Sequence, residues 1–250
     1  MKKVVARTYT GIPGLDEMLG GGLPQGRVLL VLGEPGAGKT ILSSQFLANG
    51  IDKFGENGLF VSMEENRTQY AREMGQFGWD FAVAEKQGKY SFVDASPIRT
   101  IPGEVRVGKL TLGKQDFSLI SLLEVIRSNA KAIDARRIVV DPISLLIFQY
   151  LNEAERRKAL LDLVEALAET GATCLLSSEL RRVGTRGRSL QVEEYLVHGV
   201  ILMQTITREG KPGDRIIQVE KMRETMIDRE PRPYKITEKG IEVYPRQSVI

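Results

Sequence analysis

Short apolar runs alternate with longer amphipathic stretches along most of the chain. The runs Arg27–Leu32 and Arg137–Asp141 are nearly all apolar after their first residue, which is typical of strands buried on both faces of a parallel sheet. In Lys39–Asn49 and Glu153–Glu169, apolar residues recur at helical spacing. This alternation predicts βαβ units, and therefore an α/β fold with a mainly parallel sheet flanked by helices. The other predicted strands are Gly58–Met63, Tyr90–Asp94 and Thr173–Ser177, and the other predicted helices are about Thr68–Phe77 and Phe117–Ile133.

The pattern changes near residue 200. Two pairs of apolar stretches flank the turn sequences Gly210–Gly213 and Glu238–Gly240, which predicts two hairpins. We expect them to form a C-terminal antiparallel β extension on an edge of the sheet. Residues 96–114 are rich in Pro and Gly, so we expect a loop there, either plain or with a short ribbon. Composition does not change abruptly anywhere, so we expect a single domain over residues 1–250, with 200–250 as its extension.

The composition excludes several classes of protein. Of the 250 residues, 42% are hydrophobic and 27% charged, which rules out collagen-like and wholly disordered chains. No apolar run approaches the roughly 18 residues of a membrane helix, and the first residues do not resemble a secretory signal. Cys174 is the only cysteine, so one chain cannot build a disulfide framework. We therefore expect a cytoplasmic protein that does not bind membranes.

The segment from residue 33 to residue 40 carries the strongest chemical signal. It fits G-x-x-x-x-G-K-[ST] at every fixed position, between a predicted strand and a predicted helix. Glycines let successive backbone N–H groups approach phosphate oxygens, and the helix N-terminus favours negative charge. Lys39 is expected to neutralise the β- and γ-phosphates of ATP, and the Thr40 hydroxyl to bind Mg²⁺. The predicted nucleotide-binding residues are Gly33, Glu34, Pro35, Gly36, Ala37, Gly38, Lys39, Thr40 and Ile41.

Three carboxylates end predicted strands and can act on such a nucleotide. Asp141 is expected at the sheet edge that faces the phosphates, where it could help Thr40 to hold Mg²⁺. Glu64 and Glu65 follow the second strand, and hydrolysis needs a carboxylate that prepares the attacking water. If the chain stays extended there, only one of the two can point into the site. The sequence does not say which one.

These motifs together resemble the KaiC-like branch of the RecA superfamily. The resemblance runs from about Thr10 to Tyr244 and includes the glycine-rich lead-in Gly11–Asp16, the paired glutamates and Lys221-Met222-Arg223. It implies a RecA-type ATPase core that assembles into a homo-oligomeric, hexameric ring with ATP between subunits. It further implies that Glu64 and Glu65 serve hydrolysis, and that Lys221 and Arg223 reach the γ-phosphate held by the neighbouring subunit.

A basic segment could face the central channel of such a ring. Arg181, Arg182, Arg186 and Arg188 alternate with glycines there, a composition that suits DNA or RNA phosphates. No aromatic residue lies between 181 and 194 to stack on a base, so the sequence slightly favours the alternative, a solvated basic loop that also makes salt bridges between subunits.

The sequence predicts a Mg²⁺-dependent ATPase. Two alternatives stay open: a DNA-binding recombination or repair accessory ATPase, and a nucleotide-gated signalling or assembly module with slow turnover. Nothing in the sequence identifies a protein partner.

Overall fold

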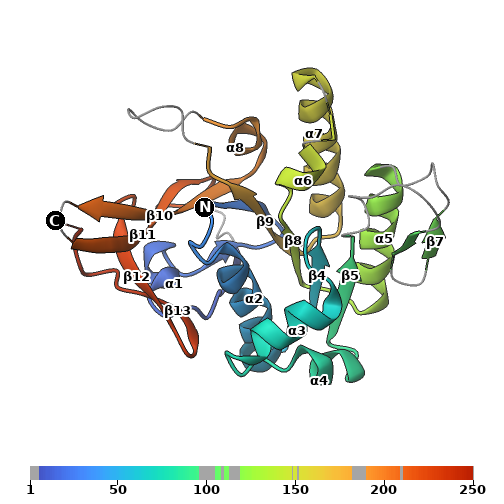
Figure 1. The fold of residues 1–250 in the computed structure, drawn as a ribbon, viewed down its shortest axis with the longest axis horizontal. Coiled ribbons are helices and arrows are strands. Elements are labelled where there is room, and N and C mark those ends of the chain that lie inside the picture. Colours follow the sequence, from blue (N-terminus) through green and yellow to red (C-terminus); the bar gives the residue numbers. More distant parts are fainter. Residues whose placement is uncertain are drawn as a thin grey trace, which may run out of the picture.

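The computed structural model describes residues 6–95, 105–107, 110–112, 119–147, 149–150, 152–181, 190–208 and 211–249. At its centre is a nine-stranded sheet with helices on both faces (Figure 1). Its strands are β3 (Val28–Gly33), β4 (Gly58–Ser62), β5 (Tyr90–Asp94), β8 (Arg137–Asp141), β9 (Thr173–Glu179), β10 (Gly199–Arg208), β11 (Lys211–Met222), β12 (Arg232–Thr237) and β13 (Gly240–Val243). They lie in the order β13-β12-β11-β10-β3-β9-β8-β4-β5.

Six of these strands are parallel, and three are antiparallel. Strands β10, β3, β9, β8, β4 and β5 form the parallel part, and β11, β12 and β13 continue it as an antiparallel meander. This confirms the α/β fold with a mainly parallel sheet and C-terminal antiparallel strands. The first C-terminal hairpin joins the sheet through β10, which pairs in parallel with β3. Both of its strands extend beyond the predicted 200–203 and 215–219, because their pairing continues through polar residues such as Thr205 and Asp214.

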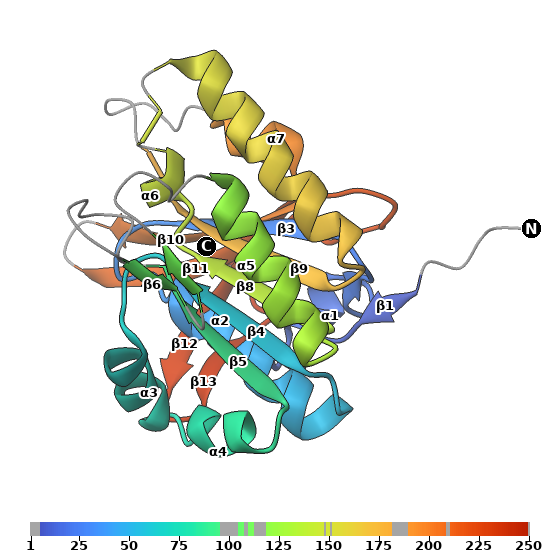
Figure 2. The same cartoon turned by 90° about the vertical axis from the view of Figure 1, so that its right-hand side faces the viewer.

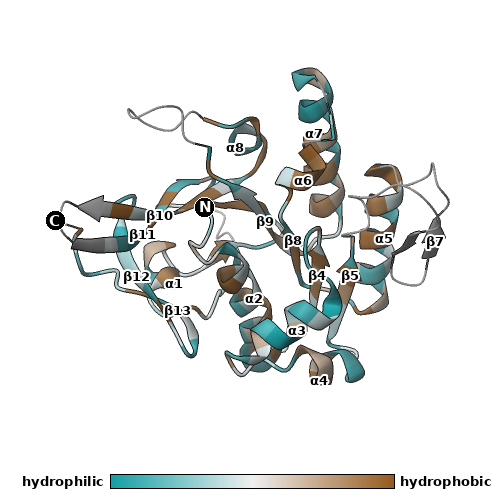
Figure 3. Cartoon of the chain, viewed as in Figure 1, coloured by the Kyte–Doolittle hydropathy of each residue, from teal (hydrophilic) through white to brown (hydrophobic). Residues whose placement is uncertain are grey.

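Alternating side chains of β3 divide the core into two layers. Val28, Leu30 and Leu32 pack in the cluster that contains α5 (Leu119–Ala132), α6 (Ser144–Ile147) and α7 (Glu153–Glu169). Leu29 and Val31 pack on the other side, in the cluster that contains α1 (Leu15–Met18), α2 (Lys39–Asn49), α3 (Arg67–Gly75) and α4 (Phe81–Lys86). Figure 2 shows α5 and α7 on one face of the sheet and α3 and α4 on the other. Colouring by hydropathy shows the apolar centre of the sheet between helices with polar outer surfaces (Figure 3).

Several short elements were not predicted. They are the helices α4, α6 and α8 (Val192–Leu196), the π-helical turn η1 (Gly50–Phe54), and the two-residue strands β1 (Arg7–Thr8) and β2 (Leu23–Pro24). Elements this short have little periodicity and depend on caps, as where the Asp80 carboxylate accepts a hydrogen bond from the Val83 N–H at the start of α4. Within 96–114, β6 (Val105–Val107) and β7 (Leu110–Leu112) form the short ribbon. The other residues of that segment lie outside the described ones. Across the described helices, none is long and apolar enough to cross a membrane.

The glycine-rich lead-in has a structural role. The Asp16 carboxylate accepts hydrogen bonds from the Thr10 N–H and hydroxyl, both at 2.8 Å, and from the Gly11 N–H at 3.0 Å. The Asn49 amide at the end of α2 then donates to the Thr10 carbonyl at 3.1 Å. The lead-in is thereby fixed to the far end of the helix that follows the glycine-rich loop.

Candidate functional site

The register of the sheet brings four strand ends together. Ser62 pairs with Asp141 across β4 and β8, and Gly33 pairs with Glu179 across β3 and β9. Because these strands are parallel, their carboxyl ends form one edge, where ligands of open α/β sheets bind. We call this the carboxyl edge. It holds the glycine-rich loop of residues 33–40, which we call the phosphate loop.

The phosphate loop has the backbone that its glycines predict. Gly36 and Gly38 adopt φ of 77° and 90°, which favours glycine strongly over other residues. Apart from its two chain neighbours, no described residue has an atom within 4 Å of the position that a Cβ on Gly36 would take, so this part of the loop is open on its outer side. Gly38 caps α2, whose N-terminus points its free N–H groups into the loop. The loop therefore suits a polyanion such as a triphosphate.

Lys39 lies over this loop, half-buried. Its ammonium group donates to the carbonyls of Gly33 at 3.0 Å and Glu34 at 3.1 Å. Burial lowers the pKa of Lys39, against the opposing effect of nearby carboxylates, of which Asp141 and Glu179 are the strongest. The cation is thus fixed at the loop in a position to neutralise phosphate oxygens.

Thr40, Asp141 and Ser177 form the inner part of the site. The carboxylate of Asp141 is 6% exposed and accepts hydrogen bonds from the hydroxyls of Ser177 and Thr40. Burial raises the pKa of Asp141, and those two hydrogen bonds and Lys39 oppose the rise. A hydroxyl beside a desolvated carboxylate is a donor set that Mg²⁺ accepts when phosphate oxygens and waters complete its shell. Among the described residues, no group of three His, Cys, Asp or Glu side chains could hold a metal by itself.

Both glutamates face this part of the site. Strand β4 ends at Ser62, whose hydroxyl accepts hydrogen bonds from the N–H groups of Glu64 at 3.3 Å and Glu65 at 2.8 Å. This bends the chain, so the extended geometry that would have separated the two side chains does not persist. Glu64, Glu65, Thr40 and Asp141 all line one cavity of about 20 Å³.

The two glutamates differ in environment. Glu64 is exposed, whereas Glu65 is partly buried. Oxygen Oε2 of Glu65 is buried without a hydrogen-bond partner among the described residues. Burial, with added repulsion from Glu73 and Asp141, raises the pKa of Glu65 to about 7. A carboxylate with a pKa near neutrality can take up and release a proton at working pH.

The C-terminal hairpin covers one side of the phosphate loop. The Tyr234 hydroxyl donates to the Ala37 carbonyl at 2.6 Å, and a Cβ on Gly38 would lie 2.9 Å from the Ile236 side chain. Beside this contact lies a cavity of about 510 Å³, lined among others by Arg215, Tyr234 and Lys235. Residues of the C-terminal hairpin therefore border the phosphate loop, although they lie far from it in the sequence.

Lys221 and Arg223 do not join the site of their own chain. Lys221 on β11 pairs with Val200 on β10, which in turn pairs with Leu30 on β3. Because Leu30 precedes Gly33 by about 10 Å along β3, Lys221 lies two strands away from Gly33 and about 10 Å from it in the strand direction. Its ammonium donates to the carbonyls of Glu194 at 2.9 Å and Val197 at 2.8 Å, and Arg223 donates to Tyr195 at 3.3 Å. Burial and the nearby Arg223 lower the pKa of Lys221.

Of the four arginines in the basic segment, the structure describes one. Arg181 is exposed, and its backbone N–H donates to the Gln191 side chain at 3.0 Å. Arg182, Arg186 and Arg188 lie outside the described residues. DNA or RNA binding at this segment stays a prediction.

Comparison with known proteins decides the family. The family model described as "ATPase: KaiC" matches residues 8–248. The chain belongs to the KaiC ATPase family. A UPF0273 protein of Pyrococcus horikoshii is 39% identical over 240 residues, covering 96% of this chain and 94% of that protein. The circadian clock oscillator protein KaiC of Synechococcus elongatus is 34% identical over 244 residues, covering 97% of this chain and 45% of that protein.

A solved structure agrees with this assignment. The crystal structure of a KaiC-like protein from Pyrococcus horikoshii superposes with a TM-score of 0.81 at 34% sequence identity. The similarity covers 97% of this chain and all of that one. It confirms the resemblance seen in the sequence.

Three residues that shape the site or its surroundings were not predicted from the sequence. The Ser62 hydroxyl bends the chain at Glu64 and Glu65, and the Tyr234 hydroxyl binds the phosphate loop. The Gln191 side chain binds the end of β9 and the residues that follow it. A serine at a strand end is a weak local signal for such a bend. No local pattern links Tyr234 to Ala37, because these residues are 197 positions apart.

Proposed function

We propose that this KaiC-family protein binds ATP with Mg²⁺ and hydrolyses its terminal phosphoanhydride, in a homo-oligomer whose sites lie between subunits. The observation that carries the proposal is the convergence of the phosphate loop, Asp141 and the two glutamates at the carboxyl edge. Lys39 and the loop amides would bind the phosphates, and Thr40 and Asp141 would hold the metal. Mg²⁺ would supply charge neutralisation at the β- and γ-phosphates.

The glutamates would act on the attacking water. Both carboxylates line the cavity beside Thr40, so either can accept a hydrogen bond from a water placed there. The proton leaving that water needs an acceptor, and the raised pKa of Glu65, about 7, favours this carboxylate for holding it. Glu64, exposed next to it, would orient the water.

The adenosine would lie toward the C-terminal hairpin. The 510 Å³ cavity lined by Tyr234 and Lys235 adjoins the phosphate loop through the Tyr234–Ala37 hydrogen bond. Tyr234 thus connects the cavity to the loop, and an aromatic side chain in the wall of a cavity suits a base.

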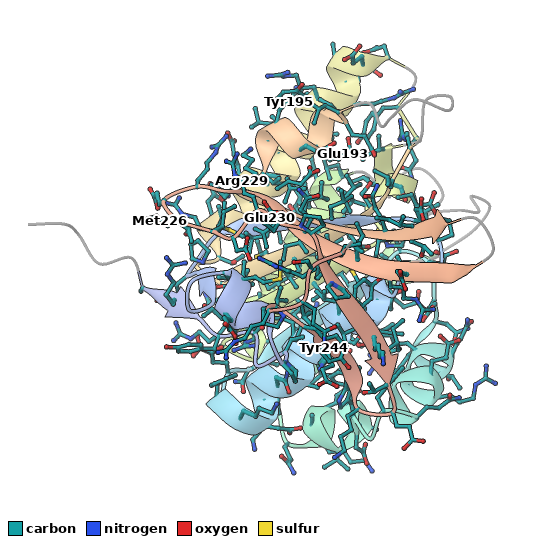
Figure 4. All side chains as sticks on the ribbon, turned by 90° about the vertical axis from the view of Figure 1, so that its left-hand side faces the viewer. Glu193, Tyr195, Met226, Arg229, Glu230 and Tyr244 are labelled. Atoms are coloured by element: carbon teal, nitrogen blue, oxygen red, sulfur yellow. The ribbon has the colours of Figure 1, made fainter. Side chains whose placement is uncertain are left out.

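A second copy of the chain would complete the site. Lys221 and Arg223 are too far from their own phosphate loop to reach a γ-phosphate there, yet a cation supplied from outside stabilises the transition state. The face beside them carries Tyr195, 57% exposed, and Met226, 93% exposed (Figure 4). Exposed apolar side chains around charged ones are typical of protein interfaces.

The test replaces both glutamates. We expect Glu64→Gln/Glu65→Gln to bind MgATP as tightly as the unmodified protein, because the phosphate loop is untouched, and to lose turnover by at least about 100-fold. Equilibrium binding of a fluorescent ATP analogue and phosphate release measure the two effects. The matched control is Glu85→Gln/Glu242→Gln, outside the cavity. Unchanged turnover in the double variant would refute the assigned base.

A further inference from the structure

A buried polar cluster joins the end of β9 to α8. It consists of Ser178, Gln191 and Glu193, which are 0%, 6% and 3% exposed. The carboxylate of Glu193 accepts hydrogen bonds from the Ser178 hydroxyl at 3.2 Å and the Gln191 side-chain amide at 3.1 Å. Buried polar groups are costly unless satisfied, so this cluster holds its members in one arrangement.

One end of the cluster reaches the phosphate loop. The Gln191 side chain donates to the Glu179 carbonyl at 3.1 Å and accepts from the Arg181 N–H at 3.0 Å, so it binds the chain on both sides of Leu180. The Leu180 N–H donates to the Gly33 carbonyl at 2.9 Å. That carbonyl also accepts from the Lys39 ammonium at 3.0 Å.

The other end reaches Lys221 and Arg223. Gln191 is the residue immediately before α8, and its N–H donates to the Glu194 carboxylate at 2.8 Å. Helix α8 has five residues, too few to be stable alone, so its position depends on these tertiary bonds. The carbonyls of Glu194, Tyr195 and Val197, in and just after this helix, are the acceptors for Lys221 and Arg223.

We propose that Gln191 is a positioning residue, which fixes α8 against the end of β9 so that Lys221 and Arg223 are presented to the site of the neighbouring subunit. This inference rests on the proposed function, because it gives these two cations their role. Gln191 touches neither the phosphate loop nor Glu64 and Glu65 in any described contact. Its connection to the phosphate loop runs through Leu180 and stays within its own subunit, whereas its connection to Lys221 and Arg223 runs through α8. The proposal assigns its effect to the second connection, and therefore to the subunit that lends the cations.

Two kinds of subunit make this testable. The lending subunit carries Glu64→Gln/Glu65→Gln and keeps its cations. The receiving subunit carries Lys221→Ala/Arg223→Ala and keeps its glutamates. Neither should turn over ATP alone, whereas a mixture should, because each receiving site then faces intact cations. Turnover of MgATP by the mixture is the baseline.

Gln191→Met is then placed in one kind of subunit at a time. We expect the turnover of the mixture to fall roughly 10- to 100-fold when the change is in the lending subunit, and to stay at the baseline when it is in the receiving one. MgATP affinity should not change in either. Gln218→Met is the matched control, a glutamine on β11 that donates to the Arg229 carbonyl. If Gln191→Met does not fold, Ser178→Ala, which removes one hydroxyl from the cluster, replaces it.

Each outcome has one meaning. An equal loss in both placements, a loss only in the receiving subunit, or no loss at all overturns the role of Gln191 and leaves the proposed function standing. If the baseline mixture itself does not turn over ATP, the shared site fails, and the role of Gln191 fails with it.

Discussion

The carboxyl edge and the corner where β11 meets α8 both present cations, but in opposite ways. At the carboxyl edge, Lys39 lies among the carboxylates of its own chain, with Asp141, Glu179, Glu64 and Glu34 as charged neighbours. Both ammonium groups donate to two backbone carbonyls, but at the corner the charged neighbours of Lys221 are the cation Arg223 and the carboxylate Glu194. Lys39 therefore belongs to a site assembled within one chain.

The charged surroundings hold Lys221 less firmly than Lys39. Nearby carboxylates attract the Lys39 ammonium, whereas the guanidinium of Arg223 repels the Lys221 ammonium, so Lys221 can turn to a phosphate at lower electrostatic cost. Similar cations near one sheet thus lie in different electrostatic surroundings, which supports the two roles that we propose: Lys39 binds the nucleotide of its own chain, and Lys221 is supplied to a neighbour.

The largest effect that we expect comes from the corner. Lys221→Ala/Arg223→Ala should lower turnover by about 1,000-fold, the scale seen when a cation supplied to a phosphoryl-transfer site is removed. Affinity for MgATP should change little, which binding titration and phosphate release would measure side by side. Arg229→Ala, an exposed charge on the same face, is the control. A parallel loss of affinity would place these cations in their own chain's site.

Lys39→Ala tests the cation at the carboxyl edge. It should weaken MgATP binding by at least about 100-fold, because charge-assisted bonds to phosphate are lost. Calorimetric titration measures this, with the exposed Lys89→Ala as control. Affinity that survives this substitution would show that the phosphates bind elsewhere.

Tyr234→Phe tests the support of the phosphate loop. Removing the hydroxyl leaves the Ala37 carbonyl without this bond, which should cost about 1 kcal/mol and lower the melting temperature by roughly 2–4 °C. MgATP affinity should fall about fivefold at most. Tyr244→Phe, in the same hairpin region, provides the comparison. Equal effects of the two substitutions would mean that the Tyr234 bond has no special role.

Glu65 is expected to make the stability of the folded protein depend on pH. Its pKa is raised from 4.5 to about 7, so the folded protein binds this proton more tightly than the unfolded chain does. The group's contribution to stability is therefore present at low pH and lost as pH rises through about 7. Glu65→Gln should raise the melting temperature of the nucleotide-free protein by more at pH 8 than at pH 5. Glu64→Gln serves as control, and a pH-independent difference would contradict this assignment.

Local signals in the sequence predicted the parts of the site that lie within one strand–loop–helix unit. The phosphate loop and Asp141 follow from glycine chemistry and from the shared edge of parallel strands. The joint exposure of Glu64 and Glu65 to one cavity was not predicted, because it depends on the Ser62 bend. Tyr234 and Gln191 were also missed, since their partners are brought to them by sheet register and by packing.

The same distinction holds for the fold. The long helices and buried strands follow from their periodicity. The position of β10 beside β3, and the helices α4, α6 and α8, depend on tertiary contacts that no short window of sequence contains.

The pairing of β3 has a consequence for biosynthesis. The phosphate loop is synthesised well before the strand that flanks β3 on one side, β10, and before Tyr234, whose hydroxyl binds the Ala37 carbonyl. A nascent chain that stops before Gly199 would contain the whole phosphate loop, but one edge of β3 would lack its neighbouring strand, β10. A chain that stops before Tyr234 would still lack the hydrogen bond from the Tyr234 hydroxyl to the Ala37 carbonyl. The phosphate loop therefore has all of its described contacts only after the chain has been made as far as Tyr234.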